Sequence, residues 1–195
     1  MLQAAFIVLG YLLGSIAFGI LISRAFGLPD PRTVGSGNIG ATNIARSGKK
    51  LPAILTLLGD AGKGWLAVFL AQYVGLSDGY ICVVALAVFL GHCYPIFYGF
   101  RGGKGVATAA GIMFAFSVWV GLAVVVTWAL VFAMSRISSV SALLASLVAP
   151  LAGWYLLSYK GYGSTALILA VLLIWRHKSN IQKLLSGTET GFKKK

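Results

Sequence analysis

Long runs of hydrophobic residues dominate the chain and are separated by short polar segments. Six such runs are present, and one of them extends without a charge from Val106 to Ser135. A transmembrane helix needs about 20 mostly apolar residues, so the runs have the length of membrane spans, although the last is short. The pattern predicts an all-α integral membrane protein.

The longest run, 106–135, exceeds one straight span, because 30 helical residues measure about 45 Å against a hydrocarbon core of about 30 Å. Basic residues indicate how it divides, since they accumulate on cytoplasmic loops. They gather in the segments 24–50, 101–104 and 176–195, so we expect all three on the cytoplasmic side. An even number of spans must then lie between the last two segments, which requires a break at 117–121.

We therefore predict one transmembrane domain, 1–195, with seven spans, an extracellular or periplasmic N-terminus and a cytoplasmic C-terminus. Gly10 and Gly14 have the spacing that allows close helix packing in the first span. The predicted spans are 2–23, 51–74, 79–97, 105–117, 119–135, 140–159 and 164–176.

Composition supports the membrane prediction and excludes several classes of protein. The chain is 58% hydrophobic and only 10% charged, unlike soluble domains, disordered chains and coiled coils. Its net charge of +12 comes from loop residues between apolar runs, so we predict contact with anionic membrane lipid and no nucleic-acid partner. The terminal Lys193–Lys195 is expected to face the same lipid.

A first polar cluster lies between the first two runs, at 35–46, and is rich in glycine, hydroxyl and amide groups. Glycines let several backbone N–H groups turn toward one anion, and Arg46 adds charge, so we predict a phosphate site. The alternative is a polar turn between two helices. The predicted binding residues are Ser36, Gly37, Asn38, Gly40, Thr42 and Asn43.

A second glycine cluster, 99–105, leads into an apolar helix. Free N–H groups and the positive end of the helix dipole favour an anion there, and Lys104 adds a point charge. The segment is not a Walker A loop, because position 98 is Tyr and Gly105 replaces the Ser or Thr that would hold magnesium. The predicted binding residues are Gly102, Gly103, Lys104, Gly105 and Thr108.

Further candidates lie near the predicted cytoplasmic ends of other spans. His177 and Asn180 follow the last run, where basic residues also serve as interfacial anchors. Ser141 opens another helix together with Ser138 and Ser139, and the alternative role for such serines is a helix cap or an interhelical hydrogen bond.

Three ionisable residues lie within predicted spans. Asp60 and Lys63 are three residues apart, on one helical face, and we expect a structural ion pair that supports the first loop, with direct substrate contact as the alternative. His92, near the inner end of its span, is predicted either to bond a neighbouring helix or to contact substrate.

In four segments the chain resembles the bacterial glycerol-3-phosphate acyltransferases that use acyl phosphate as donor. The segments, in chain order, are GSGNIGATNIARSGKK, LLGDAGKGW, GHCYPIFYGFRGGKGVAT and RHKSNIQKLLSGTE. The resemblance implies a seven-span enzyme of the bacterial cytoplasmic (inner) membrane with its active site on the cytoplasmic side. It would transfer an acyl group from acyl phosphate to the 1-hydroxyl of sn-glycerol 3-phosphate, the first step of phospholipid synthesis, with no cofactor and no metal.

Both substrates of that reaction carry phosphate, which suits the basic and glycine-rich clusters. We expect direct attack on the acyl carbonyl without an acyl-enzyme, with Arg46, Lys104 and His177 as catalytic residues. The base is a substrate phosphate, His177 or His92, and the first is favoured. The donor is expected at Ser36, Asn38, Thr42, Asn43 and 102–105, and the acceptor at Arg46, Lys104, Ser141, His177 and Asn180.

Other functions remain open at the level of sequence. An anion transporter would also combine basic glycine loops with several spans, but its polar groups would lie near the membrane midplane, often in repeats. A structural protein would leave the three polar clusters without a role. Within the enzyme prediction, a coenzyme A or acyl-carrier-protein donor is the nearest alternative, and the oligomeric state is open.

Overall fold

The structure, a computed structural model, describes residues 1–192, so the predicted lysine contact at 193–195 lies outside the described residues. Within 1–192 the chain is helical and contains no β-strand. The elements are α1 (Leu2–Gly14), α2 (Phe18–Ala25), α3 (Ala41–Arg46), α4 (Lys50–Tyr73), α5 (Asp78–Cys93), the 3-10 helix η1 (Ile96–Tyr98), α6 (Val106–Phe116), α7 (Val118–Ser135), α8 (Ser138–Leu156), α9 (Gly161–Arg176) and α10 (Lys178–Leu185).

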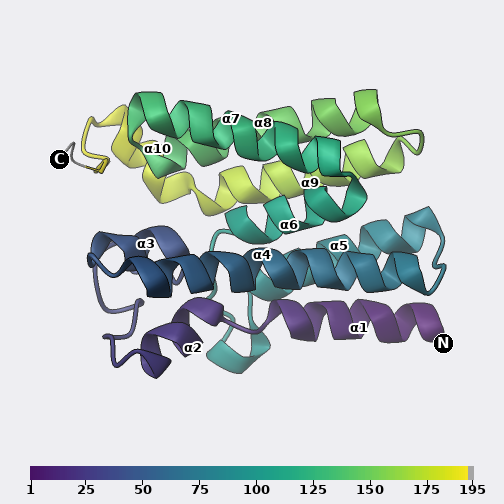
Figure 1. Cartoon of the computed structure of the whole chain (residues 1–195), viewed down its shortest axis with the longest axis horizontal. Helices are drawn as coiled ribbons and strands as arrows, with labels where there is room; N and C mark the ends of the chain where they lie inside the picture. The colour runs from purple at the N-terminus through teal and green to yellow at the C-terminus, as the bar shows by residue number, and fades with distance from the viewer. Residues whose placement is uncertain (193–195) are drawn as a thin grey trace.

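The helices form two halves (Figure 1). Helices α1, α4 and α5 pack together in one half, with the short α2 and α3 at its end, and α7, α8 and α9 form the other half. Helix α6 lies between the halves and packs on α4 and α7. The N-terminus lies at one end of the molecule, and α3, α10 and the C-terminal segment lie at the opposite end.

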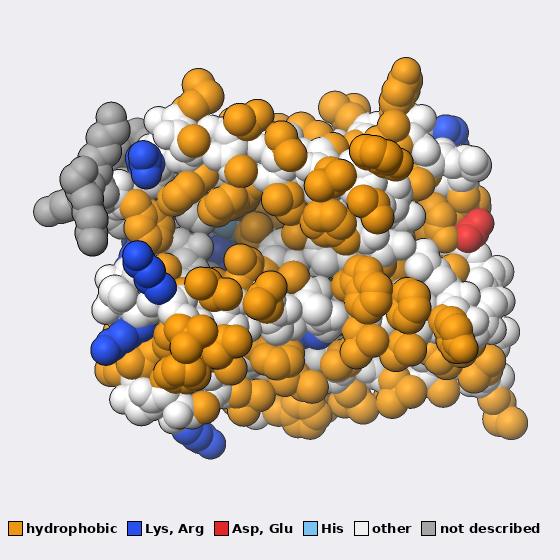
Figure 2. Space-filling view, viewed as in Figure 1, with side chains coloured by type: hydrophobic (Ala, Val, Ile, Leu, Met, Phe, Trp, Pro, Cys, Tyr) orange, Lys and Arg blue, Asp and Glu red, His pale blue; other side chains and the backbone are white. Residues whose placement is uncertain are grey.

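Many large hydrophobic side chains are exposed, and on the face shown in Figure 2 they spread over the long helices, while Lys and Arg gather mainly at the end that carries α3 and α10. Helices α4, α7 and α8, and α5 together with η1, are long and apolar enough to cross a membrane. The bent pair of α1 and α2 is a fifth candidate, while α6 and α9 are apolar but shorter. A helical fold with this surface is that of a multi-pass membrane protein, and seven crossings remain a prediction.

The first apolar run, 2–23, is not the single helix that a simple span would form. Helices α1 and α2 are bent by 42° at a break, and α2 continues to Ala25. Polar partners satisfy the break: Lys63 Nζ donates to the Ile16 carbonyl at 2.7 Å, and Ser15 Oγ accepts from the Ile96 N–H at 3.3 Å. A buried backbone group without a partner is costly, so these bonds make the bend possible at membrane depth.

The longest apolar run divides at Ser117, within the interval 117–121 that the charge pattern indicates. Ser117 has extended backbone angles, and its Oγ accepts a hydrogen bond from the Trp119 N–H at 3.2 Å, which starts α7. The helix therefore breaks here because Ser117 is the N-cap of α7, and serine is a residue type that favours this position.

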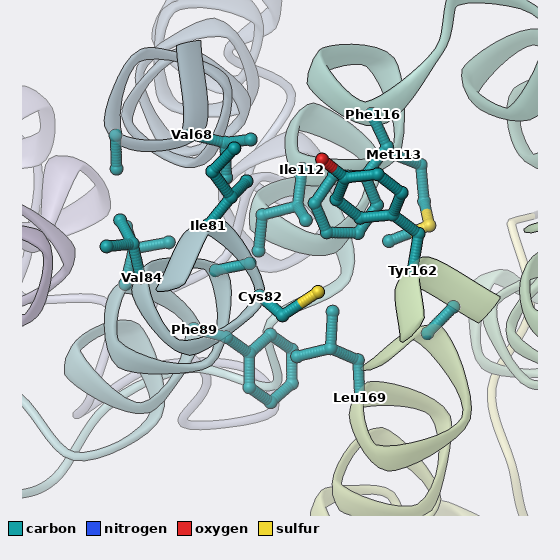
Figure 3. Packing of buried hydrophobic residues seen from close by; sticks show 14 of the residues in the cluster. Val68, Ile81, Cys82, Val84, Phe89, Ile112, Met113, Phe116, Tyr162 and Leu169 are labelled. Carbon is teal, nitrogen blue, oxygen red and sulfur yellow. The ribbon is translucent and has the colours of Figure 1, made fainter. Parts of the chain in front are cut away.

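Glycines bring helices into close contact within the first half and between that half and α6. A Cβ on Gly14 of α1 would overlap the Val88 backbone of α5, and one on Gly111 of α6 would overlap the Ala61 carbonyl of α4. Beside these contacts, side chains of α4, α5, α6 and α9 form the main hydrophobic core, including Phe89 and Ile112 (Figure 3). The core holds α6 firmly, which matters because α6 begins at the second glycine cluster.

Candidate active site

A cavity of about 390 Å³ lies between the two halves. Its polar lining comes from the end of the molecule that carries α3 and α10, and the space continues along apolar side chains of α6, α7, α8 and α9. Figure 2 shows the surface hollowed between the halves, with basic atoms inside. The polar lining residues are Ser36, Asn38, Thr42, Asn43, Arg46, Asp60, His92, Lys104, Ser138, Ser139, His177, Asn180 and Glu189, with Ser146 of α8 in the otherwise apolar part.

Asn43 organises the first polar cluster. Its side-chain Oδ1 accepts from the Ser36 N–H at 2.9 Å, and its Nδ2 donates to the carbonyls of Pro31 at 2.9 Å and Val34 at 3.1 Å. Gly35 has φ +58°, and a Cβ there would overlap Asn43 Oδ1. The amide therefore shapes the loop, which leaves Ser36 and other groups of the cluster to face the cavity.

Two contacts connect this cluster with the other half of the molecule. Thr42 Oγ1 lies 3.1 Å from Ser138 Oγ at the start of α8. Arg46 Nη2 donates to the Thr190 carbonyl at 2.7 Å, and its guanidinium lies over the Phe192 ring. The C-terminal segment thus crosses the polar end of the cavity.

Hydrogen bonds to His92 and Arg176 fix the second glycine cluster in place. The Gly103 N–H donates to the His92 carbonyl at 3.1 Å, and Arg176 donates to the carbonyls of Gly102 and Gly103. A Cβ on Gly103 would overlap the His92 ring, so only glycine fits. The carbonyls of Gly102 and Gly103 are thus bonded to Arg176, and Gly105 lines the cavity. The cluster leads directly into α6, whose first N–H groups have no intrahelical partner.

A chain of hydrogen bonds surrounds Lys104. Its Nζ donates to Asn180 Oδ1, Asn180 Nδ2 donates to Glu189 Oε1 at 2.7 Å, and Ser139 Oγ donates to the same oxygen at 2.7 Å. Burial lowers the pKa of Lys104 to about 8, and the nearby Glu189 carboxylate opposes this shift. The polar end of the cavity therefore holds Lys104 and Arg46 beside the Glu189 carboxylate, an arrangement that can bind a phosphate.

His177 is buried at the junction of α9 and α10. Its Nδ1 lies 2.8 Å from the Leu173 carbonyl, a partner that requires the Nδ1 proton. Burial lowers the pKa of His177 to about 4, so the ring is neutral at pH 7. Its Nε2 is then a hydrogen-bond acceptor, suited to a hydroxyl and not to a phosphate oxygen.

Some of the predicted binding residues lie outside the cavity lining. Ser141 is buried and its Oγ donates to the Ile137 carbonyl of its own helix at 3.0 Å, while Thr108 is buried beside Gly64 of α4. The residues in this group are Gly37, Gly102, Gly103, Thr108 and Ser141, whereas Gly40 and Gly105 do line the cavity.

Sequence reasoning missed Glu189 and placed too little weight on Ser138 and Ser139. Ser138, Ser139 and Ser141 are close in sequence at the start of α8. The direction of each side chain decides that the first two line the cavity while Ser141 bonds within its own helix. Glu189 lies in a tail whose other charges are basic, and only the fold brings it to Lys104.

The ion pair within α4 is present. Lys63 Nζ lies 2.8 Å from Asp60 Oδ1, and His92 Nδ1 of α5 lies 3.4 Å from the same oxygen. Asp60 and His92 also line the cavity, beneath the second glycine cluster. His92 therefore contacts a neighbouring helix and borders the cavity at the same time.

Comparison with known proteins adds an independent line of observation. The sequence model of a family described as glycerol-3-phosphate acyltransferase matches residues 4–187. The chain is 61% identical to the glycerol-3-phosphate acyltransferase of Methylobacillus flagellatus over 99% of this chain and 98% of the relative. It is 53% identical to the protein of the same name from Nitrosomonas eutropha, over 97% of each chain.

Solved structures show the same similarity in three dimensions. A crystal structure of PlsY, an integral membrane glycerol 3-phosphate acyltransferase, in its glycerol 3-phosphate form matches with a TM-score of 0.93 and 37% identity, over 99% of this chain and 96% of PlsY. The lysophosphatidic acid form matches with a TM-score of 0.91 and 36% identity, over the same shares.

Proposed function

This chain belongs to the glycerol-3-phosphate acyltransferase family, and from that premise we propose that it transfers a fatty acyl group from acyl phosphate to the 1-hydroxyl of sn-glycerol 3-phosphate. The products are 1-acyl-glycerol 3-phosphate (lysophosphatidate) and inorganic phosphate, so the reaction begins phospholipid synthesis.

The shape of the cavity carries this proposal. Its polar end holds Arg46 and Lys104, and its remainder is lined by side chains of four helices that are apolar except for Ser146. Acyl phosphate has the same division into a phosphate head and a hydrocarbon chain, and so does the product. Because the polar groups gather at one end of the molecule, the arrangement supports an enzyme better than a transporter with a site at the midplane.

The bond changes need little help from a protein nucleophile. The hydroxyl oxygen of the acceptor attacks the acyl carbonyl, the bond between that carbon and the phosphate oxygen breaks, and the hydroxyl proton passes to a phosphate. Because phosphate is a good leaving group, positioning and charge stabilisation can supply most of the rate. We therefore assign direct transfer without an acyl-enzyme.

Acceptor binding is assigned to the charged network. Arg46, Lys104 and Asn180 would bind the phosphate of glycerol 3-phosphate, with Ser138 and Ser139 in the role first predicted for Ser141, because these two line the cavity. His177 Nε2 would accept a hydrogen bond from an acceptor hydroxyl, since its other nitrogen is bonded to the Leu173 carbonyl.

The donor phosphate is assigned to the remaining groups of the first cluster and to the start of α6. Ser36, Asn38 and Thr42 line the cavity there, and the first N–H groups of α6 complete an anion site. Asn43, Gly102 and Gly103 shape these two loops. In this arrangement the acyl chain extends from the polar end into the apolar part of the cavity.

A substrate phosphate is the base that we favour. The second ionisation of a phosphate ester has a pKa of about 6, whereas the pKa of His177 is lowered to about 4 by burial. His177 is thus the weaker base of the two, although it can orient the hydroxyl that is deprotonated.

We further place the protein in the bacterial cytoplasmic membrane with the polar end of the cavity on the cytoplasmic side. The gathering of Lys and Arg at the end that carries α3 and α10 supports this orientation. Glycerol 3-phosphate, a soluble anion, would then enter from the cytoplasm.

The test is release of inorganic phosphate by purified protein in detergent, given palmitoyl phosphate and glycerol 3-phosphate. We expect phosphate and lysophosphatidate in equal amounts, and a fall of about 10- to 100-fold in kcat/KM in Lys104→Ala, which removes a charged hydrogen bond to substrate. Lys49→Ala, an exposed lysine outside the cavity, is the matched control and should keep wild-type activity.

Activity with palmitoyl coenzyme A and none with palmitoyl phosphate would keep the acyltransferase and disprove the donor. Equal activity of Lys104→Ala and Lys49→Ala would disprove the assigned site.

A further inference from the structure

The apolar part of the cavity has a closed end, set by the packing of α8 on α9. These helices are in close contact at Gly153 and Gly163, where a Cβ on Gly153 would lie 2.9 Å from Gly163 Cα. One turn nearer the polar end, Ala149 of α8 and Ala166 of α9 line the cavity. The two helices therefore separate above the glycine contact and meet below it.

Core side chains fill the space beneath this end. The rings of Phe116 and Tyr162 lie 4.5 Å apart, and Tyr162 is fixed by a hydrogen bond of 2.6 Å from its hydroxyl to Asp78. Met113, which lines the cavity, is almost completely buried beside this aromatic pair (Figure 3). A packed aromatic pair of this kind does not move aside cheaply, so the end of the cavity is firm.

The length of the apolar part follows from the helix rise. Ser138 at the polar end and Ala149 at the closed end are 11 residues apart on α8, which is about 16 Å. His177 and Ala166 are equally far apart on α9. One leaflet of a bilayer has about half of the 30 Å hydrocarbon core, or about 15 Å. The apolar part of the cavity is thus about as deep as the hydrocarbon layer of one leaflet is thick.

We propose that this closed end, at Ala149, Ala166 and Met113, determines the length of the acyl chain that the enzyme transfers. The inference rests on the proposed function, because it takes the acyl chain as the occupant of the apolar cavity. It adds to that function a specificity for the length of the acyl chain. Acyl chains of the length found in membrane lipids fill the cavity, and the side chain at position 149 determines where the chain must end.

Small side chains leave the room that the chain occupies. Ala142, Ala145 and Ala149 follow one face of α8 and all line the cavity. Each is buried in a region where α9 also contributes Ala166 and Ala170. A leucine at one of these positions would therefore fill the space of several methylene groups, and its level along α8 would set the length that still fits.

The experiment compares octanoyl, decanoyl, lauroyl and palmitoyl phosphate as donors for the wild type, Ala149→Leu and Ala145→Leu. A methylene that loses its apolar site costs about fourfold in binding. We expect Ala149→Leu to lower kcat/KM for palmitoyl phosphate at least about tenfold, because two or more methylenes are excluded, and to leave decanoyl phosphate within about twofold.

In Ala145→Leu, four residues nearer the polar end, the chain length with the highest kcat/KM should be shorter than in Ala149→Leu. Ala133→Leu adds the same atoms to an exposed face of α7 outside the cavity and is the matched control. Ala149→Val is the milder variant if the leucine impairs folding. The inference is overturned if Ala149→Leu lowers all chain lengths equally, or if its chain-length profile equals that of Ala133→Leu.

A second measurement separates this inference from the proposed function. The thermal unfolding midpoint is followed with 1-acyl-glycerol 3-phosphates of the same four chain lengths, which needs no donor. Loss of the palmitoyl-dependent shift in Ala149→Leu, with the decanoyl-dependent shift kept, supports the chain-length limit even if acyl phosphate proves not to be the donor. An unchanged palmitoyl shift in a folded Ala149→Leu protein disproves the limit whatever the donor is.

Discussion

Burial lowers the pKa of two residues at the polar end of the cavity, with different consequences for their charge. The pKa of Lys104 falls to about 8, so its charge is present at pH 7 but lost within the range of an assay. The pKa of His177 falls to about 4, so this ring has no charge in the same range. Of these groups, Lys104 alone changes charge between pH 7 and 9.

The KM for glycerol 3-phosphate should therefore rise at alkaline pH. In the proposed assignment only protonated Lys104 binds the phosphate, so above a pKa of about 8 the enzyme must take up a proton to bind, and KM should rise toward tenfold per pH unit. The substrate remains a dianion in this range, since its second pKa is about 6. Lys104→Arg should remove the rise, because the guanidinium keeps its charge.

Steady-state kinetics of both proteins from pH 7 to 9.5 measure this difference. The same alkaline rise in Lys104→Arg would mean that another group is responsible.

At the scale of elements, the glycine cluster before α6 tolerates substitution poorly. A Cβ on Gly103 would lie 2.2 Å from His92 Nε2, and that ring is buried between the cluster and Asp60. Gly103→Ala should thus displace the loop, destabilise the protein by about 1–3 kcal/mol as overpacking does, and greatly lower kcat/KM. Thermal unfolding in detergent and the phosphate-release assay measure the two effects.

Gly62→Ala is the control for this prediction. Gly62 lies within α4 with nothing near the position of a Cβ, so alanine should stabilise the helix by about 0.5–1 kcal/mol and leave activity intact. If Gly103→Ala were as stable and active as Gly62→Ala, the contact with His92 would not constrain the loop.

The same elements show what could be predicted from the sequence. Apolar runs and loop charge indicate the helices and the break at Ser117, because both follow from length and local chemistry. The bend after α1 could not be predicted, since it depends on Lys63 reaching the Ile16 carbonyl across the fold. The cavity residues Ser138, Ser139 and Glu189 needed the fold for a similar reason: side-chain direction and the path of the tail decide which atoms meet.

For the whole molecule, the arrangement of α6 and α7 bears on the number of membrane crossings. Lys104, before α6, bonds to Asn180, and the Arg136 carbonyl, after α7, accepts from the Phe192 N–H, so both ends of this pair lie near the C-terminal segment. The chain therefore returns at Ser117. Yet α6 has only 11 residues, about 16 Å, and is shorter than the hydrocarbon core. Seven crossings thus require a thin or locally distorted membrane at α6.

Single cysteines in intact cells test the crossing number. After Cys82 and Cys93 are replaced by alanine, cysteine is placed at one of four exposed positions: Thr33, Ser77, Ser158 or Ser186. With seven crossings and an outer N-terminus, a membrane-impermeant maleimide should label Ser77→Cys and Ser158→Cys from outside, and Thr33→Cys and Ser186→Cys only after permeabilisation. If residues 106–135 crossed only once, Ser158→Cys and Ser186→Cys would exchange sides while the other two stayed the same. The pair at 158 and 186 therefore decides whether residues 106–135 return to the side on which they start, as seven crossings require, or cross once to give six. The pair at 33 and 77 independently reports the orientation of the first half.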